Sequence, residues 1–334
     1  LLSHIDGSYQ RRFWHAFKDY CLEHDYDLVI YASRLWRGQR ESFRDQEIVY
    51  RLSSAHKIDA LCIDSSAFHN QDALDTFLSS NPALSSIPIL FSSTGREGTL
   101  SIVPDNRDGI RQAMEHLHTI HGLHHFAWIG GPDDIADARE RQEAFLEYTT
   151  AWEISPPQAW IRSAGFDSPS GRRETKAILD AGLGLPEVIV YANDLMAAGG
   201  LEVLHERGIR VPEDLRVCGF DGDDLSLLVS PPLATVSQPV EEKARIAARL
   251  LVDAIRGIAP TQPPPLAVSF MPRSSCGCTK RADSYQPQRK KTGDTSPGQA
   301  REESLEARIQ DHWAINNMAL ITEYLGSILS MEQL

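Results

Sequence analysis

The sequence predicts an α/β protein built from two Rossmann-like lobes, each with a parallel sheet. The chain has 334 residues, which is close to twice the usual length of one domain. Short apolar runs rich in β-branched residues alternate with amphipathic stretches, a pattern typical of parallel strands covered by helices on both faces. The alternation occurs in two successive series, and each series indicates one lobe.

The first series opens on LLSHID, which is typical of the end of a strand. Phe13, Phe17 and Cys21 then recur every four positions, as on a helix that buries one face. The run LVIYAS is short, apolar and β-branched, and it predicts a buried strand. The elements predicted after the first helix are strands at 28–33, 60–64 and 87–91 and helices at 41–54 and 73–79.

The second series opens with a predicted helix at 106–120. Ile110, Met114 and Leu117 lie on one face of this helix, and Gly122 follows as a stop signal. The other elements predicted here are strands at 125–131, 159–163, 187–194 and 215–224 and helices at 139–149, 170–180 and 195–207.

The character of the chain changes after Gly257. A proline-rich run at 260–265 precedes a last predicted strand at 266–273. Residues 279–300 are polar, with few large apolar side chains, and are expected to form a linker. Helix-forming residues return at 301–334, with apolar positions at near-heptad spacing over about two heptads, fewer than a firm coiled-coil prediction needs.

Composition excludes several classes of function. The chain carries 33 Lys and Arg against 46 Asp and Glu, a formal net charge of −13. This sign is wrong for a surface that follows a phosphate backbone, so direct nucleic-acid contact by this segment is not expected. No apolar run reaches the roughly 18 residues that cross a bilayer. The five cysteines are odd in number and favour a reducing, cytoplasmic setting.

Polar residues follow most of the predicted strands. Ligands of open parallel sheets bind beyond the carboxyl ends of the strands. A hydroxylated or charged small molecule held between the lobes is therefore expected.

Four segments, in order along the chain, resemble the ligand-binding region of the LacI/GalR repressor family. They are VPDNRDGIRQAMEHLHTIHGLHHFAWIGG, RQEAF, VIVYANDLMAAGGLEVLHERGIRVPEDLRVCGFDGDD and SPPLATVSQPVEEKARIAARLL. The resemblance implies the periplasmic-binding-protein-like type I fold, with a three-crossing hinge near Val103, 237–240 and 266–268. PRSSCGC at 272–278 is similar to the ending of a subgroup fused to signalling output modules such as GGDEF or histidine kinase proteins.

The implied division of the chain follows from these crossings. The predicted parts are an N-terminal lobe at 1–103 and 240–267, a C-terminal lobe at 104–239 and 268–278, a linker at 279–300 and a signalling helix at 301–334.

The resemblance also implies ligand-binding residues. Arg141 would reach into the cleft and donate paired hydrogen bonds to ligand oxygens, and the alternative is a surface arginine paired with Glu140 or Glu143. Asp221 would accept hydrogen bonds from ligand hydroxyl or amine groups. Its alternative is helix capping within the acidic run at 221–224.

Four further positions match family positions at the cleft. Asn193 would offer a donor and an acceptor, or cap the helix that follows. Phe166 and Tyr9 would stack on the ligand or pack in the core, and Gln238 would lie at a hinge crossing. The sequence departs from the family at 10–12 and at Gly222, which leaves the ligand's identity open.

Metal, redox and cofactor chemistry is not predicted. The histidines between His116 and His125 are interrupted by Gly122. The pair Cys276 and Cys278 has C-x-C spacing, with no second C-x-x-C or histidine partner suited to zinc, and is interpreted as a structural strand end. The sequence also lacks G-x-G-x-x-G, G-x-S-x-G and P-loop motifs. We therefore predict no cofactor and no metal.

From this organisation we predict the small-molecule-binding sensor region of a cytoplasmic signal-transduction protein. Closure of the cleft on a sugar or nucleoside-like metabolite would control a C-terminal output domain, in a homodimer, the usual assembly. Repressors of this family carry a helix-turn-helix before the first strand and usually end soon after the last strand. This sequence instead begins within the first strand and continues past the last one, which is the basis of the expectation. The alternative is the effector-binding core of a LacI/GalR-type transcription regulator without its DNA-binding domain. A metal-dependent enzyme is a third class, and we predict no catalysis.

Overall fold

The structure, a computed structural model, describes residues 1–4, 7–33, 58–64, 71–93 and 99–278. The predicted helix at 41–54, the linker at 279–300 and the helix at 301–334 lie outside the described residues. The secondary structure expected for these three segments therefore stays a prediction. Residues 1–281 form one compact unit.

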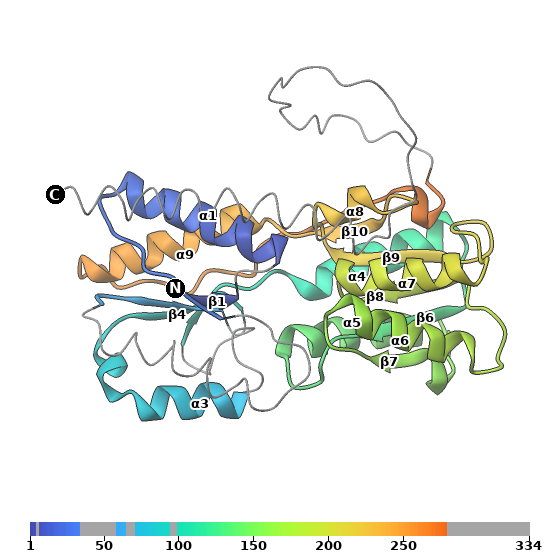
Figure 1. The fold of residues 1–334 in the computed structure, drawn as a ribbon, viewed down its shortest axis with the longest axis horizontal. Coiled ribbons are helices and arrows are strands. Elements are labelled where there is room, and N and C mark those ends of the chain that lie inside the picture. Colours follow the sequence, from blue (N-terminus) through green and yellow to red (C-terminus); the bar gives the residue numbers. More distant parts are fainter. Residues whose placement is uncertain (5–6, 34–57, 65–70, 94–98, 279–334) are drawn as a thin grey trace, which may run out of the picture. The chain divides into compact units, whose positions relative to one another are not determined.

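The first lobe contains a five-stranded parallel sheet. Its strands are β1 (Leu2–His4), β2 (Tyr31–Ser33), β3 (Leu61–Ile63), β4 (Ile89–Phe91) and β5 (Leu100–Ser101), in the order β2-β1-β3-β4-β5. The helices are α1 (Ser8–Glu23), α3 (Gln71–Ser80), the short η2 (Pro82–Ser86) and α9 (Val240–Ile255). Helices α1 and α9 lie side by side on one face of the sheet, and α3 covers the other face (Figure 1). The return of α9 to this lobe explains why the lobe needs two separate stretches of chain.

The second lobe contains a six-stranded sheet in the order β11-β10-β9-β8-β6-β7. Its strands are β6 (Phe126–Gly130), β7 (Ile161–Ser163), β8 (Val188–Tyr191), β9 (Arg216–Asp221), β10 (Ala234–Ser237) and β11 (Ser269–Met271). All neighbours pair in parallel except β10 and β11, which are antiparallel. The last predicted strand is thus an antiparallel edge strand, because the chain enters it from the first lobe rather than through a helix on this sheet.

Helices cover this sheet in packed pairs, α4 with α5 and α6 with α7. The helical elements are α4 (Asn106–Glu115), η3 (His116–Ile120), α5 (Ala136–Ala151), η4 (Gln158–Trp160), α6 (Ser168–Leu179), α7 (Asp194–Glu206), α8 (Leu225–Leu228) and η5 (Ser274–Cys276). Asp105 and Asp167 begin α4 and α6 as N-caps, since their side chains accept hydrogen bonds from the backbone N–H groups of Asp108 and Ser170. The predicted helix at 106–120 is α-helical only to Glu115 and ends in the π-helical turn η3.

The cores lie between each sheet and its helices. Phe77 and Phe91 are in the core cluster of the first lobe, and Trp128, Phe145 and Phe220 are among the largest fully buried side chains of the second. Strands β3, β6 and β8 are buried at every position, as expected of parallel strands covered on both faces.

The chain passes between the two sheets three times: after β5, after β10 and before β11. Two of the crossings pair directly, because Leu266 N donates to Val103 O and Asp105 N donates to Leu266 O, both at 2.8 Å. The fold class predicted from the sequence, an α/β protein with two parallel-sheet lobes, is confirmed. Among the described residues, no helix is long and apolar enough to cross a membrane.

Candidate functional site

A polar cluster lies at the carboxyl ends of the strands of the second sheet. In each lobe the strand order places the first strand between the second and the third, so the direction of winding changes beside β1 and beside β6. Ligands of open α/β sheets bind at such a point. Residues after β6, β7, β8 and β9 meet here, and they include four of the six residues predicted from the sequence.

Arg141 is the centre of the cluster. It lies on α5 and is only 4% exposed. Its Nε donates to Asn106 Oδ1 at 2.8 Å, and its Nη1 donates to Ala192 O at 2.6 Å. The guanidinium carbon lies 3.7 Å from the centre of the Phe220 ring. The alternative of a surface arginine paired with a neighbouring glutamate is therefore wrong, because α5 turns this side chain inward.

Asp221 ends β9 with a backbone φ of 121°. Its Oδ1 lies 3.6 Å from Arg141 Nη1 and accepts a hydrogen bond from Gln238 Nε2 at 2.7 Å. Burial raises the pKa of Asp221 to about 7, although Arg141 opposes the shift. Arg141, Asp221 and Gln238 thus form one contiguous charged and polar group.

Asn193 caps α7, as its alternative role predicted. Its Oδ1 accepts from Met196 N at 2.9 Å, and its Nδ2 donates to the Phe166 carbonyl at 3.0 Å. Phe166 has a left-handed φ of 59°. Its ring packs against Gly131, where a Cβ atom would lie 2.1 Å from the ring. The cap therefore fixes the loop that presents Phe166.

Tyr9 lies in the first lobe, in the first turn of α1. Its hydroxyl accepts a hydrogen bond from Lys243 Nζ at 3.0 Å, and burial raises its pKa. Burial alone would lower the pKa of Lys243, but Tyr9 and the carboxylates of Asp137 and Asp64 raise it. Asp137 belongs to α5 of the second lobe and Asp64 to the first lobe, so carboxylates of both lobes interact electrostatically with Lys243.

Two contacts join the first turns of α1 to the loop after β9. Ser8 Oγ donates to Asp223 Oδ2, and Arg12 Nη1 donates to Gly222 O at 3.3 Å. The sequence departs from the family at residues 10–12 and at Gly222, and the contact between Arg12 and Gly222 brings the two places together. Gly222 has a φ of 66° and a Cβ atom there would lie 2.6 Å from Ser237 Cα, so a side chain does not fit.

Sequence reasoning missed two polar residues of this region, Asn106 and Lys243. Asn106 is 1% exposed and donates to Asp137 Oδ1 and Glu140 Oε2 while it accepts from Arg141. Lys243 is 3% exposed. Asn106 and Lys243 each lie in the first turn of a helix that follows a crossing between the lobes. A polar residue at such a position was the signal in the sequence that could have identified them.

A pocket of about 720 Å³ lies elsewhere, in the first lobe, between α3, η2 and strand β4. It contains none of the six predicted residues, and its lining includes Thr99, which follows the undescribed residues 94–98. We regard the strand-end cluster as the better candidate site because it combines buried charge, aromatic surface and contributions from both lobes.

The histidine cluster and the C-x-C pair, neither of which is predicted to bind a metal, come together in the structure. His116 and His121 meet Cys276 and Cys278 at the far end of α4 from Asn106. The missing histidine partners of the cysteines are thus supplied by a distant segment.

Two parallel-sheet lobes joined by three crossings, with a polar cluster at the strand ends, define the periplasmic-binding-protein-like fold of type I. Residues 114–276 match the family model of the periplasmic binding protein-like domain. The solved and curated relatives of this chain include the Lac repressor and other transcription regulators.

Two solved structures illustrate the likeness. The transcriptional regulator CelR in complex with cellobiose is 26% identical, with a TM-score of 0.67, over 80% of this chain and 79% of that chain. The Lac repressor dimer bound to operator and the anti-inducer ONPF is 25% identical, with a TM-score of 0.67, over 80% of this chain and 89% of that one.

The curated relatives are transcription regulators. The repressor PurR of Aliivibrio fischeri (strain MJ11) is 28% identical over 245 residues, 72% of this chain and 69% of the relative. The regulator CelR of Thermobifida fusca is 36% identical over 155 residues, 46% of this chain and 44% of the relative. The ribose operon repressor of Halalkalibacterium halodurans is 32% identical over 154 residues, 46% of this chain and 45% of the relative.

These relatives correct the functional prediction. The main prediction, a sensor region that controls a signalling output domain, is wrong, because the similar proteins repress or regulate transcription. They favour the alternative, the effector-binding core of a transcription regulator. The relatives are regulators and not enzymes, and the prediction of no catalysis is confirmed.

Proposed function

We propose that residues 1–278 are the effector-binding core of a LacI-type transcription regulator. A small polar molecule binds between the lobes and shifts them toward one arrangement. The effector-binding residues in this proposal are Tyr9, Arg141, Phe166, Asn193, Asp221 and Gln238.

The ion pair between buried Arg141 and half-buried Asp221 carries the proposal. A buried charge pair is expensive to desolvate and contributes little net stability, so its place at the strand ends favours a role in recognition. Arg141 offers planar paired donors for ligand oxygens, and Asp221 offers acceptors for hydroxyl groups. Phe166 supplies an apolar face of the kind on which sugar rings pack.

The hinge is coupled to this pair through Gln238. Gln238 lies in the second crossing and donates to Asp221 through Nε2, while its backbone N–H donates to the Asp221 carbonyl at 3.2 Å. A ligand that competes for Asp221 therefore alters the contacts of a hinge residue. Only a ligand with different affinities for the two arrangements of the lobes can shift their equilibrium. In this proposal the lobes are 1–103 with 240–267, and 104–239 with 268–278.

The proposed effector is a sugar, with a nucleoside as the second candidate. Cellobiose is bound in the solved structure of the regulator CelR, and a ribose operon repressor is among the curated relatives. An arginine, two amide side chains, a carboxylate and two aromatic rings suit a ring that carries several hydroxyl groups. The protein is proposed to act as a homodimer in the cytoplasm.

Replacing Arg141 by alanine is expected to weaken effector binding roughly 10- to 100-fold, because hydrogen bonds to a charged group contribute about 1.5–3 kcal/mol. Isothermal titration calorimetry with the sugars and nucleosides that stabilise the wild type in a thermal-shift screen would measure it. Arg139→Ala removes an exposed arginine from the same helix and is the matched control. Equal affinity of wild type and Arg141→Ala would reject the site.

Regulation of transcription is tested separately, with the full-length gene product. Gel-shift titration against the promoter DNA of its own and neighbouring genes should reveal binding that an identified effector changes. Effector binding to the core without any DNA binding by the full-length protein would reject the regulatory role and leave the effector site intact.

A further inference from the structure

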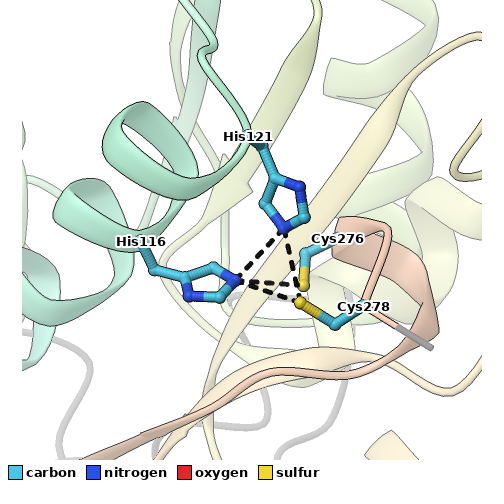
Figure 2. A group of neighbouring side chains, drawn as sticks. All are labelled: His116, His121, Cys276 and Cys278. Atoms are coloured by element: carbon cyan, nitrogen blue, oxygen red, sulfur yellow. Dashed lines mark hydrogen bonds between the residues drawn. The ribbon is translucent and has the colours of Figure 1, made fainter. Parts of the chain in front are cut away.

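Four metal-ligating side chains from two distant segments converge at the end of α4 (Figure 2). His116 begins the π-helical turn η3 and His121 follows its last residue. Cys276 ends η5, and Cys278 follows after one glycine. Their ligating atoms all lie within 4.8 Å of one another. The sequence separation between the pairs is about 160 residues, since His116 and Cys276 are 160 positions apart.

The distances within the cluster match those of a tetrahedral zinc site. His116 Nε2 and His121 Nε2 are 3.2 Å apart, and Cys278 Sγ lies 3.3 Å and 3.4 Å from them. Cys276 Sγ lies 3.8 Å from His116 Nε2. Bonds of about 2.3 Å to sulfur and 2.0–2.1 Å to nitrogen place tetrahedral ligands about 3.3 Å apart for two nitrogens and about 3.5 Å apart for nitrogen and sulfur.

The local backbone is built to bring each pair together. Residues five apart point to different faces of an α-helix, but the wider π-helical turn η3 aligns His116 with His121. Gly277 between the two cysteines has a left-handed φ of 94°, which reverses the chain so that both sulfur atoms point to the histidines. A Cβ atom at Gly277 would lie 3.4 Å from His121 Cε1 and 3.2 Å from Arg216 Nε.

Charge suits thiolate ligands here, because a bound cation and the neighbouring Arg216 oppose the burial that raises the pKa of the free Cys276 thiol to about 11. Cys276 is fully buried. Arg216 lies beside the turn, and its buried Nε has no hydrogen-bond partner among the described residues. A nearby guanidinium favours thiolate over thiol. Two thiolates and two neutral imidazoles around Zn²⁺ give a site with no net charge, which reduces the cost of its burial.

We propose that His116, His121, Cys276 and Cys278 form a structural Zn²⁺ site. Soft sulfur and borderline imidazole ligands in tetrahedral geometry select zinc over magnesium or calcium. All four positions are taken by protein ligands, so no position is open for a substrate. On binding, the two thiol protons pass to solvent. The ion fastens the segment after β11 to the C-terminal end of α4.

This site is distinct from the proposed effector site. Arg141 contacts Asn106, the first residue of α4, whereas His116 follows the last residue of this ten-residue helix. At a rise of 1.5 Å per residue the helix separates them by about 15 Å. Loss of zinc is therefore expected to lower stability without removing the effector-binding groups.

Zinc content of the wild-type chain tests the proposal directly. The protein is purified without a polyhistidine tag, kept reduced with TCEP, incubated with one equivalent of Zn²⁺, desalted and analysed by ICP-MS. We expect about one zinc ion per chain. In Co²⁺-substituted protein we expect the intense visible bands of tetrahedral coordination together with thiolate charge-transfer absorption. Chelation should lower the apparent Tm by roughly 5–10 °C.

Paired variants locate the ion. The double variants His116→Asn/His121→Asn and Cys276→Ala/Cys278→Ala should retain below roughly a tenth of the wild-type zinc. The double variant His124→Asn/His125→Asn removes two exposed imidazoles of the same segment and should retain all of it. If a ligand variant fails to fold, the zinc content and the cobalt spectrum of the wild-type protein still test whether the chain binds zinc in tetrahedral geometry.

Three results would overturn the proposal: reduced wild-type protein without bound zinc, a six-coordinate cobalt spectrum, or zinc retained by both ligand variants. A disulfide between Cys276 and Cys278 is the competing chemistry. It predicts two fewer reactive thiols in protein purified without reductant, and no zinc uptake after reduction.

Discussion

Replacing Gly171 by alanine is expected to destabilise the second lobe by about 3 kcal/mol or more. Gly171 lies on α6, and a Cβ atom there would be 2.3 Å from the carbonyl oxygen of Met196 and 2.6 Å from its Cα atom, both backbone atoms of α7. Gly199 makes the reciprocal approach, because its Cβ atom would lie 2.3 Å from the Ser168 carbonyl oxygen. Backbone atoms cannot rotate away, so the two helices would have to move apart.

Urea denaturation of wild type and Gly171→Ala measures this effect, and the Tm should fall by roughly 10 °C. Gly165→Ala is the matched control, because a Cβ atom at Gly165 meets only ordinary contacts of 3.5 Å and more. A stability of Gly171→Ala within about 0.5 kcal/mol of the wild type would mean that α6 and α7 do not pack this closely.

The contribution of Asp221 to folding stability is expected to fall as pH rises from about 4 to about 7. Burial raises the pKa of Asp221 from 3.8 to about 7. The folded state then binds the proton more tightly than the unfolded chain. The contribution of this group is fully present below about pH 4 and is lost as pH rises through the folded pKa, a change of roughly 4 kcal/mol.

Asp221→Asn isolates this contribution because an amide does not ionise. Between pH 4 and pH 8 the difference in unfolding free energy between variant and wild type should shift by roughly 4 kcal/mol in favour of the variant. Asp224→Asn, at an exposed position in the same loop, should show no comparable shift. A constant difference for Asp221→Asn across this pH range would show that the carboxyl is not desolvated as the structure indicates.

Most of the architecture could be predicted from the sequence, because periodicity is local. The predicted helices at 139–149 and 170–180 correspond to α5 and α6, and their ends differ by one to three residues. The run LVIYAS was predicted as one strand, but only its last three residues form β2. Short apolar runs fix the presence of a strand better than its bounds, since pairing partners decide where a ladder stops.

The candidate effector site could be predicted in part. Arg141 is buried and approaches Asp221, whereas ligand binding by these two residues stays a prediction. Asn193 proved to be a helix cap as well. Asn106 and Lys243 were missed because their neighbours in sequence are ordinary helix-start residues, and only the packing of the lobes brings them to the charged groups.

The sequence by itself determined the alternation of strands and helices, the two lobes and the candidate residues at the strand ends, because each depends on the order of nearby side chains. Tertiary structure alone decided which distant residues touch. Gly171 of α6 and Gly199 of α7 lie at close backbone contacts, and two histidines lie beside two cysteines about 160 positions away in the sequence. Such pairs leave no periodic signal, because their proximity depends on how complete elements pack in space.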